Sequence, residues 1–99
     1  MKRLRLTLLA RQDLKEIGDY IAEDNAQAAI AFVRRLKEKC LVLSRNPGIG
    51  RRRFDIDPSV RGASEGNCLI VYRQTIKGVE ILRIIHGMRD LTRIVFPVT

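Results

Sequence analysis

The sequence predicts an α+β domain in which a strand and two helices are followed by three strands. Three observations support this prediction: an alternating segment near the N-terminus, two apolar stripes at helical spacing, and β-rich runs separated by glycine turns. Helices gathered in one part of a chain and strands in another favour the α+β class. With 99 residues, of which 45% are hydrophobic, we expect a single domain over residues 1–99.

The first two elements are an expected strand and an expected helix. Over residues 2–8 leucine alternates with arginine or threonine, which is the pattern of a half-buried strand. From about residue 10 the spacing changes, because Leu14, Ile17 and Ile21 recur at three and four residues with charged side chains between them. This spacing predicts an amphipathic helix that ends near residue 24.

A second, longer helix is expected after Asn25, whose side-chain oxygen can accept a backbone N–H of the first turn. Its apolar stripe comprises Ala29, Phe32, Val33, Leu36, Cys40 and Leu43. The segment Asn-Pro-Gly-Ile-Gly at 46–50 should end this helix, because proline disfavours helical backbone in the residue before it and glycine admits positive φ.

Three strands are expected in the second half of the chain. Residues 60–65 form a short candidate strand, and the β-rich runs 68–73 and 79–86 form a hairpin around the turn at Lys77-Gly78. The chain is ambiguous from Gly87 onward, and the apolar tail from Leu91 to Phe96 has two open interpretations. It either packs back on the sheet as an edge strand or faces a partner.

The last of these strands has apolar residues on both faces. Strict alternation places Ile81 and Ile85 together around Arg83, on the face that the two helices do not cover. We expect this face to be a partly exposed apolar patch, which usually marks a partner site. The alternative is that the stem of Arg83 shields the two isoleucines.

Composition limits the kind of protein. Lys and Arg number 19 against 11 Asp and Glu, a net charge of +8, which favours an acidic partner, either nucleic acid or an acidic protein. Cys40 and Cys68 lack metal-binding spacing and are interpreted as reduced core residues, so no metal or cofactor is expected. No segment resembles a membrane span or signal peptide, and we expect a cytoplasmic protein.

Four motifs, in order, resemble the ParE branch of the RelE/ParE toxin superfamily over about residues 4–95. They are Ala-Arg-Gln-Asp-Leu at 10–14 with Ile17 and Tyr20, Asn-Pro-Gly-Ile-Gly-Arg at 46–51, Tyr72 in a strand, and Ile-Leu-Arg-Ile-Ile-His-Gly-Met-Arg-Asp at 81–90. The resemblance implies a RelE/ParE-like, mostly antiparallel sheet backed by a helical hairpin. It also implies a ParD-like antitoxin in a hetero-oligomer, DNA gyrase as target, and no sequence-specific nucleic-acid binding by the toxin itself.

The other branch of this superfamily cleaves mRNA on the ribosome, which requires an acid, a base and cations for the phosphate. Leu69 and Val95 occupy positions where that branch is expected to have an arginine and a tyrosine, and Val60 and Gly62 lie roughly where a lysine pair would be. We therefore expect a non-enzymatic toxin. The alternative is a ribosome-dependent mRNA endonuclease.

Several side chains are candidates for binding the antitoxin or the target. The basic and apolar candidates are Arg61, Arg73, Ile81, Arg83, Ile85, Arg89, Ile94 and Phe96. Arg89 either faces the target or forms a local ion pair with Asp90. The run Arg51-Arg52-Arg53 is either solvated or in contact with an acidic surface. His86 and Tyr72 are interpreted as structural residues.

Overall fold

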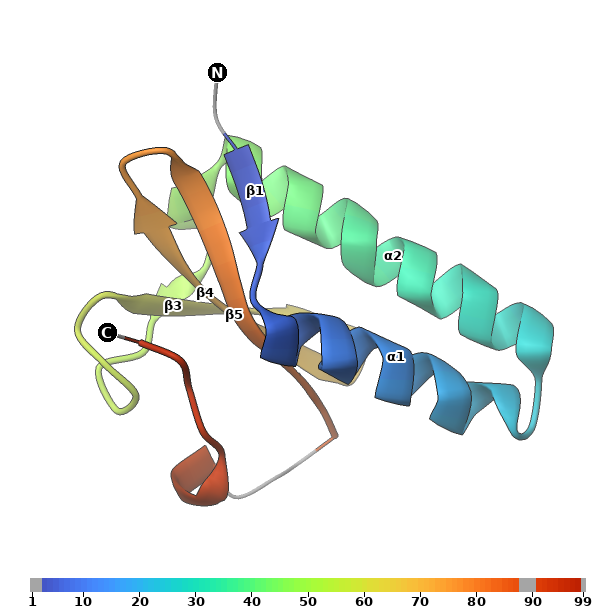
Figure 1. Cartoon of the computed structure of the whole chain (residues 1–99). Coiled ribbons are helices and arrows are strands. Elements are labelled where there is room, and N and C mark those ends of the chain that lie inside the picture. Colours follow the sequence, from blue (N-terminus) through green and yellow to red (C-terminus); the bar gives the residue numbers. More distant parts are fainter. Residues whose placement is uncertain (1–2, 88–90, 99) are drawn as a thin grey trace.

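The computed structural model describes residues 3–87 and 91–98 and contains a helical hairpin packed beside a five-stranded sheet (Figure 1). The elements are β1 (Arg3–Leu6), α1 (Leu8–Ala22), α2 (Ala26–Arg45), η1 (Pro47–Ile49), β2 (Arg51–Arg52), β3 (Val60–Glu65), β4 (Cys68–Thr75), β5 (Gly78–His86) and η2 (Leu91–Arg93). The predicted class and element order are confirmed, with β2 and two 3₁₀ turns in addition. Neither α-helix has the length and apolar character needed to cross a bilayer.

The strands lie in the order β1-β5-β4-β3-β2. β1 pairs with β5 in parallel, whereas the pairs β5–β4, β4–β3 and β3–β2 are antiparallel. After β1 and both helices, the chain re-enters the sheet at the opposite edge as β2. It then crosses the sheet strand by strand until β5 lies beside β1. The sheet is mostly antiparallel.

Side-chain caps set the starts of both helices. Thr7 accepts a hydrogen bond from Ala10 N (3.1 Å) and donates one to Leu82 O (2.7 Å), so α1 begins at Leu8. The predicted alternation over residues 2–8 is therefore too long: β1 ends at Leu6, and Leu8 is the exposed first residue of α1. Asn25 caps α2 by accepting from Ala28 N (3.0 Å), which confirms the predicted cap.

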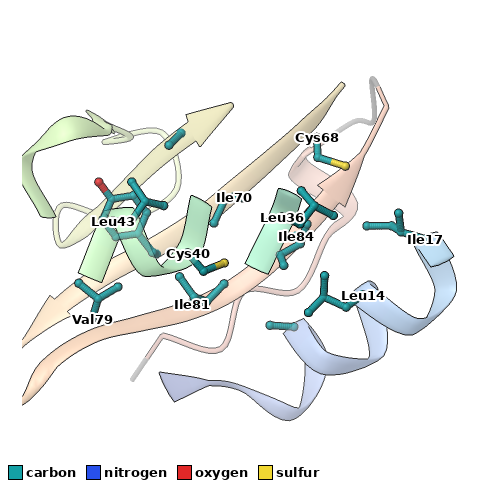
Figure 2. Packing of buried hydrophobic residues seen from close by; sticks show 13 residues of the cluster. Leu14, Ile17, Leu36, Cys40, Leu43, Cys68, Ile70, Val79, Ile81 and Ile84 are labelled. Carbon is teal, nitrogen blue, oxygen red and sulfur yellow. The ribbon is translucent and has the colours of Figure 1, made fainter. Parts of the chain in front are cut away.

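The main core lies between the helical hairpin and one face of the sheet. Figure 2 shows Leu36 and Cys40 of α2 directed toward strand residues that include Ile84. Cys40 and Cys68 are both free and buried, as predicted, and burial raises the pKa of each thiol to about 11. Both thiols therefore remain protonated and act as small apolar core groups.

The opposite face of the sheet has a second core, formed by Val60, Val71, Leu82 and Ile85. The residues that pack over it are Ile56, Leu69, Leu91, Ile94, Phe96 and Val98. Most of these covering residues belong to the C-terminal segment, red in Figure 1. This segment folds back over the face of the sheet that the helices do not cover. The expectation that this face stays partly exposed is wrong, because the chain closes it with its own tail.

Candidate functional site

A β-bulge decides which face each residue of β5 occupies. Val71 lies opposite Arg83 while Tyr72 lies opposite Ile81, so Leu82 is an additional residue in β5. An additional residue interrupts the alternation of side chains between the two faces. Ile81 is 0% exposed in the helix-side core, and Ile85 is 2% exposed in the second core. The predicted exposed patch of Ile81 and Ile85 around Arg83 is therefore wrong.

Arg83 joins three parts of the chain. Its guanidinium donates from Nε to Asp13 Oδ2 and from Nη2 to Asp13 Oδ1, both at 2.8 Å, which is a two-pronged contact with α1. Its Nη1 donates to the carbonyl oxygen of Val95 at 2.9 Å. One side chain of β5 thus holds the first helix and the C-terminal tail.

Asp13 is the acceptor at the centre of this arrangement. Besides the guanidinium, Asp13 Oδ2 accepts the backbone N–H of Ile84 at 2.9 Å. The side chains of Arg83 and Asp13 are only 15% and 8% exposed, and the hydrogen bond that Arg83 donates to Asp13 is the main cause that raises the pKa of Arg83. Asp13 was not among the predicted site residues, although a carboxylate beside Leu14 on the apolar stripe of a helix is a signal that a buried cation must pair with it.

The C-terminal candidates Ile94 and Phe96 lie on the second core and are half-buried. The tail packs back on the face of the sheet as a 3₁₀ turn followed by irregular chain, and not as the edge strand that was one of its two interpretations. Val95 between them is 69% exposed, since its backbone is held by Arg83 while its side chain points to solvent.

The basic candidates of the sheet are engaged in contacts within the chain. Arg61 donates from Nη1 to Gly50 O at 2.8 Å, and Arg73 Nη2 lies 2.9 Å from Glu80 Oε1. Both side chains remain accessible in part. Arg89, and with it the expected ion pair to Asp90, lies outside the described residues.

In the basic run at 51–53, one arginine is paired within the chain and two are exposed to solvent. Arg53 forms a two-pronged contact with Asp55, with distances of 3.0 and 2.8 Å. Arg51 and Arg52 are exposed on the short edge strand β2, and the Arg52 guanidinium lies 5.8 Å from the ring centre of Phe54. Phe54, an exposed aromatic residue beside Arg52, was not among the predicted site residues.

The Tyr72 hydroxyl holds the turn between α2 and β2 by two hydrogen bonds. Its hydroxyl donates to Pro47 O (2.7 Å) and accepts from Gly50 N (2.8 Å), and burial raises the pKa of this phenol. A Cβ at position 50 would collide with the Tyr72 hydroxyl, so the turn requires glycine there. These contacts fix the segment between α2 and β2 against the sheet.

Comparison with known proteins decides the family. The family model described as the ParE toxin of the type II toxin-antitoxin system, parDE, matches residues 4–91. The chain belongs to the ParE toxin family. A search of curated proteins finds no match.

Two solved structures resemble this family member. A chain of the chromosomal ParDE toxin-antitoxin system from P. aeruginosa is 28% identical, with a TM-score of 0.75, and the match covers 89% of this chain and 98% of that one. A chain of the toxin-antitoxin complex RelBE2 from Mycobacterium tuberculosis is 26% identical, with a TM-score of 0.58, and the match covers 86% and 96%. The RelE/ParE-like fold expected from the sequence is confirmed.

In this ParE-family chain, His86 lies far from Arg73 of β4. The His86 ring packs edge-on to Tyr20 (ring centres 5.7 Å apart) and near Phe32 (6.4 Å). Along the β4–β5 ladder His86 pairs with Cys68, whereas Arg73 pairs with Glu80, five residues further along β4. At the rise of a strand this separates His86 from Arg73 by roughly 17 Å.

Proposed function

We propose that this ParE-family toxin inhibits DNA gyrase by binding it, without catalysis, and that a ParD-like antitoxin neutralises it. Family membership over residues 4–91 and the likeness to a chain of a ParDE system support the proposal. On this proposal the protein acts in the cytoplasm, where gyrase and DNA are found.

The observation that most supports a non-enzymatic mode of action is that His86 lies far from Arg73 while the Tyr72 hydroxyl is already engaged. General acid–base cleavage requires a proton-transfer group within hydrogen-bond reach of the reacting atoms. His86 lies roughly 17 Å along the sheet from Arg73. The Tyr72 hydroxyl is buried and has both a donor and an acceptor partner in the backbone.

A second candidate function is mRNA cleavage on the ribosome, which the likeness to a chain of the RelBE2 complex favours. Against it, Leu69 packs on the second core and Val95 offers a solvent-facing isopropyl group at the two positions where that chemistry is expected. Neither side chain can transfer a proton or stabilise a phosphate charge.

Two assays on the antitoxin-free protein, run side by side, separate these functions. The proposal predicts loss of gyrase supercoiling activity, and translation of a reporter mRNA that proceeds with the message intact. Cleaved message together with unaffected gyrase would overturn the proposal in favour of the endonuclease.

The antitoxin is proposed to bind as a flexible acidic segment that folds on the toxin. A net charge of +8 favours an acidic partner, and a disordered segment can cover a large surface as it folds. We expect an adjacent short reading frame that encodes a DNA-binding half followed by an acidic or amphipathic half. Its product should restore gyrase activity when mixed with the toxin.

A further inference from the structure

A basic groove lies where the β4–β5 turn meets β1. It has a volume of about 710 Å³ and is lined by Arg3, Arg5, Ser59, Arg73, Gln74, Thr75, Ile76, Lys77, Val79 and Glu80. It lies at one end of the sheet, away from the C-terminal tail and from His86 with its ring contacts to Tyr20 and Phe32. None of the functional interpretations above uses it as a whole.

Cations dominate the groove. Arg3, Arg5, Arg73 and Lys77 line it, against one carboxylate, Glu80. Glu80 is already paired, since its Oε1 lies 2.9 Å from Arg73 Nη2 and its Oε2 lies 3.6 Å from Arg5 Nε. Asp57, whose Oδ1 accepts from Ser59 at the rim, adds one further negative charge, so four cations face two carboxylates.

Three of these cations are exposed to solvent, and of the three only Arg5 contacts Glu80, at 3.6 Å. Arg5 has a side chain that is 78% exposed, and Arg3 and Lys77 are also exposed. Within residues 3–87 and 91–98, neither Arg3 nor Lys77 forms an ion pair. Arg3 and Arg5 lie on the same side of β1, roughly 7 Å apart, so they can contact separate phosphate groups.

Backbone contacts hold β1 beside the tip of the β4–β5 hairpin. Arg3 N donates to Lys77 O at 2.8 Å, which fixes β1 against the tip of the hairpin. Gly78 has a φ of +150°, and a Cβ there would collide with the backbone of Arg3. The close approach of the two segments depends on this glycine, and it places Lys77 beside the arginines before any ligand arrives.

Ile76 adds an apolar contact point at the tip of the hairpin. Its side chain is 105% exposed, the largest exposure of any large hydrophobic residue in the described chain, and it lies between Thr75 and Lys77. Isoleucine side chains beside cations are among the wedges that proteins place against the minor groove of DNA. Duplex DNA carries regularly spaced phosphates beside a groove that accepts such a side chain, so one ligand can engage both the cations and Ile76.

We propose that this groove binds the phosphate backbone of duplex DNA without sequence preference, with Arg3, Arg5 and Lys77 on the phosphates and Ile76 against the minor groove. Phosphate contacts from Arg and Lys supply affinity that does not depend on sequence and falls steeply with salt. The proposal does not depend on gyrase being the target, because the contact is with DNA alone.

The test measures binding of a fluorescent duplex of about 20 base pairs to antitoxin-free protein, by anisotropy, between about 50 and 200 mM salt. The groove variant carries Arg3→Gln, Arg5→Gln and Lys77→Gln. Its salt slope, d log K/d log [salt], should be smaller in magnitude by about 3 than that of the unmodified protein. Ile76→Ser should weaken binding several-fold and leave this slope unchanged.

The matched control removes the same charge from the helices, with Arg11→Gln, Arg34→Gln and Lys37→Gln, three exposed residues outside the groove. This control should change the slope by less than about 1. Equal losses in the two triple variants would overturn the proposal, because diffuse charge would then explain the binding.

Two further results would also count against DNA as the occupant. One is the absence of duplex binding at the lowest salt. The other is tighter binding of a poly-glutamate peptide than of the duplex, lost in the groove variant, which would assign the groove to an acidic protein. If the triple variant does not fold, as judged by circular dichroism, the single variants Arg5→Gln and Lys77→Gln replace it, each with an expected slope change of about 1.

Discussion

At the scale of single residues, the contact between Asp13 and Arg83 lies where three segments of the chain meet. It connects α1 to β5, and the same guanidinium holds the carbonyl of Val95 in the tail. Removing one partner of a buried ion pair leaves the other charge without compensation, which is more costly than loss of the pair as a whole. Asp13→Ala should therefore lower the free energy of unfolding by about 3 kcal/mol, measured by urea denaturation.

Control variants separate the ion pair from packing. Asp13→Asn retains an oxygen for Ile84 N and should be less destabilising than Asp13→Ala. Asp19→Ala, which breaks the exposed pair to Lys15 (2.7 Å), should have no measurable effect. If Asp13→Ala lowers the free energy of unfolding no more than Asp19→Ala does, the buried pair does not stabilise the fold.

Tyr72 offers a second test at this scale. Tyr72→Phe keeps the ring in the core but leaves Pro47 O and Gly50 N, both in buried residues, without their partner. We expect a loss of about 2 kcal/mol in the free energy of unfolding. Tyr20→Phe is the matched control, because Tyr20 is exposed, and it should be neutral. Equal melting temperatures for the two variants would contradict the structural role of the Tyr72 hydroxyl.

At the scale of elements, the C-terminal tail is the least regular segment and closes the second core. A protein truncated after Asp90 loses the cover of Leu91, Ile94, Phe96 and Val98 over the strands. Exposed apolar surface should then bind the dye ANS, and the melting temperature should fall. Val95→Ala, at an exposed side chain in the same segment, should change neither quantity.

The same truncation tests whether the tail contacts the target. If the tail is the target-binding segment, the truncated protein should lose gyrase inhibition, and so should a Phe96→Ser variant that remains folded. Retained inhibition by folded, truncated protein would exclude the tail from the target interface and leave only its structural role.

The elements themselves were largely predictable from local patterns. The strand at 60–65 was predicted with the bounds of β3, and Asn25 was recognised as the cap of α2. β2 was missed because Arg51-Arg52 has neither alternation nor β-branched residues. The bulge at Leu82 was missed because it depends on the pairing of β5 with β4, and no local signal in the sequence marks it.

Side-chain partners were less predictable than elements. Asp13 and Arg83 are 70 residues apart, and only the packing of α1 on β5 brings them together. The basic groove was missed for the same reason, since Arg3 and Lys77 meet through the parallel pairing of β1 with β5. Patterns along the chain identify local structure, whereas sites are built from contacts between distant segments.

At the scale of the whole molecule, the ordered motifs along the chain identified the family correctly, and the family match over residues 4–91 confirms it. The proposed mode of action is supported by features that only the folded chain has: the engaged Tyr72 hydroxyl, the ion-paired Arg73 and Arg83, and the distance of His86 from Arg73. A protein that acts by binding alone must act in proportion to its amount, whereas an enzyme turns over many target molecules.

The most direct test of the central claim is therefore a titration of purified gyrase with antitoxin-free toxin, scored by supercoiling and by trapped, cleaved plasmid. The proposed function predicts that inhibition rises with the ratio of toxin to gyrase, saturates near stoichiometric amounts, and is reversed by added antitoxin. Undiminished supercoiling at a large excess of folded toxin would contradict it.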